Sequence, residues 1–200
     1  MSHGSAVCEI GYLFVEFVCV IPWKCVSLNN QNRGKIMDGI LRKLPIGIQT
    51  FEKLREGDYL YVDKTALVWR IASTETPYFL SRPRRFGKSL LLSTFEAYFE
   101  GKKELFEGLA IADMEKEWKT YPLFHLDLNA EKYDSPQALV EILSRQLTQW
   151  ELKYGKGEDE ETLSGRFAGV IRRACEQSGR GVVVLVDEYD KPLLQALGDD

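Results

Sequence analysis

An aliphatic run near the end of the sequence constrains the fold more than any other feature. Val182 to Val186 are five aliphatic residues in succession. A strand that is apolar on both faces is typical of a parallel sheet covered by helices on both sides. The run ends in Asp187 and Glu188, and open α/β sheets bind their ligands at the carboxyl ends of their strands. The sequence therefore predicts an α/β protein with two carboxylates at the binding edge of its sheet.

A basic loop precedes this strand in the sequence. It reads R-P-R-R-F-G-K-S over residues 82–89, and it lies between the apolar segments Tyr78–Leu80 and Leu90–Leu92. A strand, a loop ending in Gly-Lys-Ser and a helix form the arrangement that holds a nucleoside triphosphate. Gly87 lets the backbone approach the phosphates, Lys88 reaches the β- and γ-phosphates, and the Ser89 hydroxyl ligates Mg²⁺. The alternative is a basic turn with solvated arginines, because Arg82 replaces the first glycine of the general pattern.

The two motifs complement each other in chemistry and in order along the chain. Asp187 is expected to hold the Mg²⁺ that Ser89 touches, and Glu188 to orient and deprotonate the attacking water. The expected catalytic residues are Lys88 and Glu188, and the expected metal ligands are Ser89 and Asp187. The residues expected to bind the nucleotide are Arg84, Arg85, Phe86, Gly87, Lys88, Ser89 and Leu90.

Several segments together give the chain a family resemblance. They are Leu44–Gln49, Phe51–Arg55, Tyr59–Thr65, Ser81–Ser89, Tyr121–Leu128 and Val186–Pro192. From Leu44 onward the chain resembles the AAA-ATPase-like proteins of bacteria, in which Arg82 is the family's own variant of the phosphate loop (Walker A). The resemblance implies a P-loop NTPase fold, a three-layer αβα sheet of the additional-strand type, with ATP and Mg²⁺ as ligands. In this family a PD-(D/E)XK nuclease-like domain usually follows, so a link to nucleic acid would run only through a domain absent here.

The expected strands are residues 78–81, 122–128 and 182–187, with a short further strand at 59–62. In the additional-strand class another strand lies between the phosphate-loop strand and the acidic (Walker B) strand, and it comes later in sequence. The chain ends at Asp200 before such a strand, so we expect a sheet that is incomplete at the C-terminus. We also expect unpaired strand edges and self-association of the isolated chain.

The expected helices cover residues 64–73, 88–100, 106–118 and 161–178, and a long helix begins at Ser135. Asp63 is expected to cap the first of these, and Ser135 the long one. A second interpretation places Tyr59, Tyr61 or Asp63 beside the adenine. His125 is expected to pack in or beside the sheet rather than to act in catalysis.

We divide the chain into an atypical extension (1–36), a lead-in segment (37–76) and a truncated P-loop ATPase core (77–200). The extension is interpreted as upstream sequence read in frame, with Met37 as the natural start. Its apolar stretch, Ile10 to Trp23, contains Glu16 and is shorter than the roughly 20 residues that span a bilayer. We therefore expect a cytoplasmic protein without a membrane partner.

The formal net charge of −4 gives no overall attraction to nucleic acid or to an anionic membrane. The function expected from these residues is that of an ATP-binding and ATP-hydrolysing domain. Two alternatives stay open: a nucleotide-dependent switch or interaction module with little hydrolysis, and the ATPase part of a DNA-processing protein. A homo-oligomer is also an open alternative.

Overall fold

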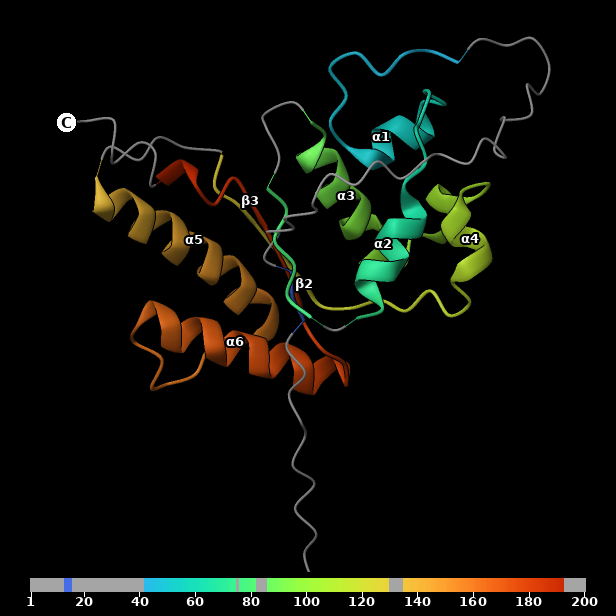
Figure 1. The fold of residues 1–200 in the computed structure, drawn as a ribbon. Helices are drawn as coiled ribbons and strands as arrows, with labels where there is room; N and C mark the ends of the chain where they lie inside the picture. Colours follow the sequence, from blue (N-terminus) through green and yellow to red (C-terminus); the bar gives the residue numbers. More distant parts are fainter. Residues whose placement is uncertain (1–12, 16–41, 75, 82–85, 130–134, 193–200) are drawn as a thin grey trace, which may run out of the picture.

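The structure is a computed structural model that describes residues 13–15, 42–74, 76–81, 86–129 and 135–192. The described strands form a parallel sheet in the order β1-β3-β2. These strands are β1 (Leu13–Val15), β2 (Leu123–Asp127) and β3 (Val183–Asp187). Helices α5 (Pro136–Tyr154) and α6 (Leu163–Ser178) lie on one side of the sheet, and the other helices lie on the opposite side (Figure 1).

Strand β3 contributes to two hydrophobic cores, one on each face of the sheet. Val183 and Leu185 belong to the core that includes Phe95 of the α3 helix, whereas Val184 belongs to the core that includes Val170 of α6. This alternation follows from the two-residue period of a strand, and each fully buried Val or Leu side chain stabilises the fold by about 1.5–3 kcal/mol. The predicted strand buried on both faces is confirmed, and with it an α/β architecture.

The helices on the far side of the sheet from α5 and α6 are short. They are α1 (Phe51–Glu56), α2 (Thr65–Ala72), α3 (Lys88–Phe99), the 3₁₀ turn η1 (Lys103–Phe106) and α4 (Ala110–Met114). The single helix expected over residues 106–118 is wrong in extent. Gly108 has a φ of +75°, a left-handed conformation that a right-handed helix cannot continue, so η1 and α4 are separate elements.

Asp63 fixes the starts of two helices. Its Oδ1 accepts hydrogen bonds from the backbone N–H and the hydroxyl of Thr65, at 2.8 and 2.6 Å. Its Oδ2 accepts one from the backbone N–H of Ala110 at 2.7 Å. These bonds satisfy amide groups that helix ends leave unpaired. The N-cap residue of α2 is Lys64 and not Asp63, but Asp63 bonds the first residue of the helix from one position earlier and also ties α2 to α4.

Two other helix boundaries agree with the sequence. The Ser135 hydroxyl accepts a hydrogen bond from the backbone N–H of Ala138 at 3.3 Å and begins α5. Gly179, with a φ of +66°, ends α6. A polar side chain at the first cap and a glycine at the last are the residues that helix termini favour.

Two predicted strands are not strands of the sheet. Residues 59–62 form only an isolated bridge, between Tyr59 and Lys43, and within residues 78–81 only Phe79 has bridge geometry. The place beside β3 opposite β2 is taken by β1, whose Leu13–Val15 pair with Val183–Leu185. The predicted unpaired edge is therefore wrong for Val183–Leu185, which pair with β1 on one side and with β2 on the other.

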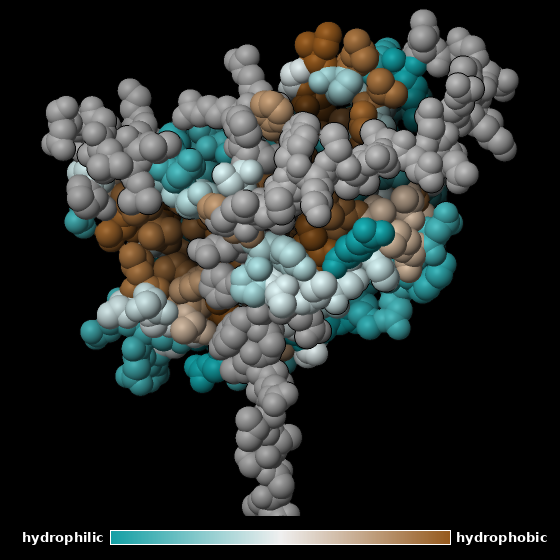
Figure 2. All heavy atoms as spheres, viewed as in Figure 1, coloured by the Kyte–Doolittle hydropathy of each residue, from teal (hydrophilic) through white to brown (hydrophobic). Residues whose placement is uncertain are grey.

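Apolar side chains also reach the surface. Figure 2 shows brown, hydrophobic surface at the top of the view and on its left side. The most exposed large apolar residues are Ile46, Leu152, Val62, Leu44 and Phe86. None of the described helices is long and apolar enough to cross a membrane.

Candidate functional site

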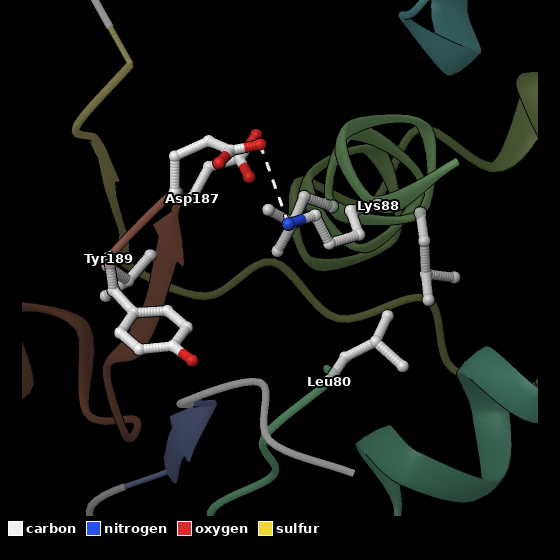
Figure 3. A pocket seen from close by; sticks show the side chains of 8 residues that line it. Leu80, Lys88, Asp187 and Tyr189 are labelled. Carbon is white, nitrogen blue, oxygen red and sulfur yellow. Dashed lines mark ion pairs between the residues drawn. The ribbon is translucent and has the colours of Figure 1, made fainter. Parts of the chain in front are cut away.

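A pocket lies where the carboxyl end of β3 faces the first turns of α3. Figure 3 shows Lys88 and Asp187 on opposite walls of this pocket. Its lining residues come from the segment before the loop, from α3 and from the end of β3: Leu80, Lys88, Leu91, Leu92, Val186, Asp187, Glu188 and Tyr189. Lys88, Asp187 and Glu188, three residues that sequence analysis assigned to one site, therefore meet in space.

Gly87 gives α3 an open N-terminus. It is the N-cap residue, with a φ of +76°, and no side chain caps the helix. Among the described residues, apart from its chain neighbours and its own helix backbone, no atom lies within 4 Å of where a Cβ would be, so the left-handed backbone favours glycine here. The first amides of α3 lack intrahelical partners and carry the positive end of the helix dipole. This helix end is suited to an anion.

Lys88 and Glu188 form an ion pair across the pocket. The Lys88 Nζ lies 3.6 Å from the Glu188 Oε1, and the two side chains are 20% and 21% exposed. Both groups are thus partly shielded from water, where an ion pair is stronger than at the open surface. The pair places a cation and a carboxylate beside the first amides of α3.

The backbone of Glu188 explains how its carboxylate reaches the pocket. Successive residues of a strand point to opposite faces, so a strand continued beyond Asp187 would direct Glu188 away from α3. Glu188 instead has a φ of +53°, and β3 ends one residue earlier. A left-handed non-glycine residue costs about 1–3 kcal/mol and is concentrated at functional sites. The turn brings both carboxylates to the α3 side of the sheet.

Asp187 is the most buried charged group of the pocket. It is 9% exposed, and its side chain makes no hydrogen bond or ion pair with another described residue. A carboxylate with little exposure favours a nearby cation or hydrogen-bond donor, and the Asp187 oxygens are not among the buried unpaired atoms of the described residues, so they are open to the pocket. The site therefore fits a bound cation beside Asp187.

Mg²⁺ is the cation that suits these residues. It takes oxygen ligands, and in nucleotide sites it keeps several waters and binds substrate phosphates with one or two carboxylates. Asp187 offers a carboxylate, and Ser89, half-buried as the second residue of α3, offers a hydroxyl. Among the described residues no group of three or more His, Cys, Asp or Glu gathers to hold a metal ion.

The other residues expected to bind the nucleotide do not line the pocket among the described residues. Phe86 is 63% exposed and directly precedes Gly87. The side chain of Leu90 packs against the core on the α3 side of the sheet, so a contact of Leu90 with a ligand would use its backbone. Arg84 and Arg85 lie outside the described residues.

Five lining residues, among them Leu80 and Tyr189, were not assigned to the site from sequence. Tyr189 packs edge-on against Phe79, with ring centroids 4.8 Å apart, and this contact holds the segment that contains Leu80 against the end of β3. Leu80 closes the pocket below Lys88 in Figure 3. Their positions in the sequence could have indicated that Leu80 and Tyr189 line the site. Leu80 ends the apolar segment before the loop, and Tyr189 directly follows Glu188.

His125 packs beside the sheet, as expected. Its Nδ1 lies 3.5 Å from the Glu96 Oε1 of α3, and its Nε2 is buried without a hydrogen-bond partner among the described residues. The hydrogen bond with Glu96 is the main cause that raises the pKa of His125, and burial opposes it. This pair connects β2 to the helix that begins with Lys88.

Comparison with known proteins identifies the family of this chain. Residues 45–200 match the family described as AAA-ATPase-like, "Predicted AAA-ATPase". The chain therefore belongs to the AAA-ATPase-like family.

A protein of Azotobacter chroococcum mcd 1, named "Uncharacterized protein in vnfD 5'region", is similar to this chain. The two are 44% identical over 157 residues, which are 78% of this chain and 30% of that protein. The chain thus spans less than a third of the length of this relative. No solved structure matches the chain.

Proposed function

We propose that this chain is an ATP-binding and ATP-hydrolysing domain that uses Mg²⁺. The observation that carries the proposal is the meeting of Lys88, Asp187 and Glu188 in one pocket at the start of α3 and the end of β3. Membership of a family of predicted ATPases supports the same function. Phosphoryl transfer needs positioning and charge stabilisation more than covalent chemistry, and this pocket offers both.

The residues of the pocket take separate roles in this proposal. The free amides at the start of α3 bind phosphate oxygens, and Lys88 leaves Glu188 to bind the β- and γ-phosphates. Ser89 and Asp187 hold Mg²⁺, which supplies Lewis-acid stabilisation of the phosphate charge when bound. Glu188, released from Lys88, accepts a proton from the attacking water. Arg84 and Arg85 are proposed to neutralise the γ-phosphate.

We also propose the P-loop fold of the additional-strand type for this domain, with the core within residues 77–200. The support is the order along the chain, in which the loop is followed by α3, β2 and β3, together with the family match. The preference for adenine as the base of the nucleotide is proposed from the family alone.

A second candidate function is a nucleotide-dependent switch with little hydrolysis. The Lys88–Glu188 ion pair favours it, because a carboxylate held by a lysine is not free to act as a base. Under this alternative ATP breaks the ion pair and changes the position of Tyr189 and the segment that follows β3, and turnover stays slow.

Steady-state release of phosphate from Mg·ATP tests the proposal and separates the two candidates. Wild-type protein is compared with Lys88→Ala and Glu188→Gln, and with Lys53→Ala on the exposed side of α1 as the matched control. ATP hydrolysis predicts turnover that both site variants abolish and the control retains. Tight Mg·ATP binding with no turnover above that of Glu188→Gln would support the switch instead.

A further inference from the structure

A second aspartate lies beside Asp187 at the same edge of the sheet. Asp127 is the last residue of β2 and Asp187 the last of β3, and the two are Cα partners in the parallel register. Neighbouring strands are about 4.8 Å apart, and paired residues direct their side chains to the same face. His125, two residues before Asp127 and thus on the same face, contacts Glu96 of α3. Asp127 therefore projects to the α3 side, as Asp187 does.

The position of the Asp127 carboxylate is fixed by its surroundings. Its Oδ1 accepts a hydrogen bond from the backbone N–H of Asn129 at 2.7 Å. Asn129 is itself held by Lys191, whose Nζ donates to the Asn129 Oδ1 at 3.3 Å. The backbone N–H of Leu128 donates to the Asp187 carbonyl at 3.1 Å. The ends of β2 and β3 are thus joined, and within the described part of the chain the Oδ2 of Asp127 has no hydrogen-bond partner.

The carboxyl ends of β2 and β3 carry a surplus of carboxylates that a cation would neutralise. Asp127, Asp187 and Glu188 lie at the ends of two adjacent strands. Lys88 is paired with Glu188 and Lys191 binds Asn129, so neither lysine is paired with Asp127 or Asp187 among the described residues. Asp187 is nine-tenths buried, lines the pocket and makes no side-chain hydrogen bond or ion pair with another described residue, although its charge helps to raise the pKa of His125. Two neighbouring carboxylates repel each other, and a divalent cation between them and the phosphates removes the repulsion.

We propose that Asp127 is a positioning residue for Mg²⁺: its free carboxylate oxygen accepts a hydrogen bond from a water bound to the ion on Asp187. The inference rests on the proposed function, since it assigns a water-mediated contact to the same Mg²⁺ ion. Asp127 is exposed and is not among the residues that line the pocket of Asp187, so it acts through water rather than as a direct ligand. Substitution of a residue that hydrogen-bonds to a metal ligand typically lowers metal affinity about 10- to 100-fold.

The test uses Mn²⁺ as the spectroscopic probe, titrated by electron paramagnetic resonance into protein with ATP. Asp127→Asn keeps an oxygen acceptor for Asn129 but removes the charge. We expect its Mn²⁺ affinity to fall by about tenfold, with ATP affinity in EDTA and the melting temperature unchanged. Saturating Mn²⁺ should restore wild-type ATP affinity, which it would not do for a variant with a damaged fold. Asp127→Glu, which keeps the charge, should recover part of the lost affinity.

Asp159→Asn, in the loop between α5 and α6, is the matched control and should bind Mn²⁺ as the wild type does. An Asp127→Asn protein that binds Mn²⁺ within twofold of wild type would overturn the inference. Asp187→Asn separates this failure from failure of the proposed function. If Asp187→Asn and Lys88→Ala weaken Mn·ATP binding and Asp127→Asn does not, only the role of Asp127 is lost. If none of the three matters, the proposed site is wrong.

Discussion

The Lys88 ammonium group lies 3.6 Å from the Glu188 carboxylate, although the two residues belong to different elements far apart in sequence. This ion pair joins the start of α3 to the turn after β3, so the Gly-Lys-Ser segment and the acidic strand end lie at one site. It also occupies the two groups that the proposed reaction uses. A triphosphate must therefore compete with Glu188 for Lys88.

This competition predicts the effect of Glu188→Gln on binding. The glutamine cannot form the ion pair, so Lys88 is free for the phosphates and ATP should bind at least as tightly as to wild type, by up to a few-fold. Calorimetric titration with the non-hydrolysable analogue AMPPNP measures this affinity. Weaker binding by Glu188→Gln than by wild type, in folded protein, would mean that Glu188 supports the ligand instead of competing with it.

Gly87 predicts a graded response to substitution. Its φ of +76° is strained for residues with a Cβ, least for Asn and most for β-branched residues. Gly87→Asn should lower the free energy of unfolding by less than about 1 kcal/mol, and Gly87→Val by more. Urea denaturation of the two variants gives the comparison. Equal losses would show that the left-handed conformation does not govern this position.

The Glu96–His125 pair predicts a pH dependence of stability. The pKa of His125 is raised from its ordinary 6.5, mainly by its hydrogen bond with Glu96, so its contribution is complete below pH 6.5 and is lost as pH rises through the folded-state pKa. The pKa of Glu96 is lowered from its ordinary 4.5, mainly by the bond with His125. Its contribution is complete above pH 4.5 and is lost as pH falls through the folded-state pKa.

The pair should therefore stabilise the fold most between pH 4.5 and pH 6.5. Because both side chains are about a third exposed, we expect about 0.5–1 kcal/mol. Urea denaturation in the absence of metal, on wild type and His125→Gln, measures the difference at several pH values. A difference that stays constant from pH 5 to pH 8.5 would contradict the pairing.

Helices α5 and α6 are joined by a largely buried ion pair. The Arg166 guanidinium donates to both oxygens of Glu151, at 2.7 and 2.8 Å, and the side chains are 11% and 6% exposed. Arg166→Ala leaves the Glu151 carboxylate buried and unpaired, which should destabilise the protein by about 3 kcal/mol.

Urea denaturation measures the loss, and ATP affinity should not change, because the pair lies on the side of the sheet away from α3 (Figure 1). Arg172→Ala, on the exposed face of the same helix, is the matched control and should have little effect. A variant at Arg166 as stable as the control would show that the pair contributes nothing net.

The sequence predicted those parts of the fold and site that local pattern determines. The aliphatic run of β3, the glycine before α3 and the capping residues Asp63 and Ser135 each specify their own surroundings. The pairing of strands is not local, so Phe79 was assigned to a strand although β1 takes the place beside β3. The proximity of Asp127 to Asp187 depends on the strand order for the same reason. The left-handed conformation of Glu188 has no marker in sequence, because the residue is not glycine.

The central claim is that Lys88 and the carboxylates of β3 form one ATP site, and Mg·ATP binding tests it most directly. Calorimetric titration compares wild-type protein with Lys88→Ala and the control Lys53→Ala. We predict saturable binding by wild type and control, and at least a tenfold loss for Lys88→Ala. Equal binding by all three proteins, or no binding by folded wild type, would contradict the account.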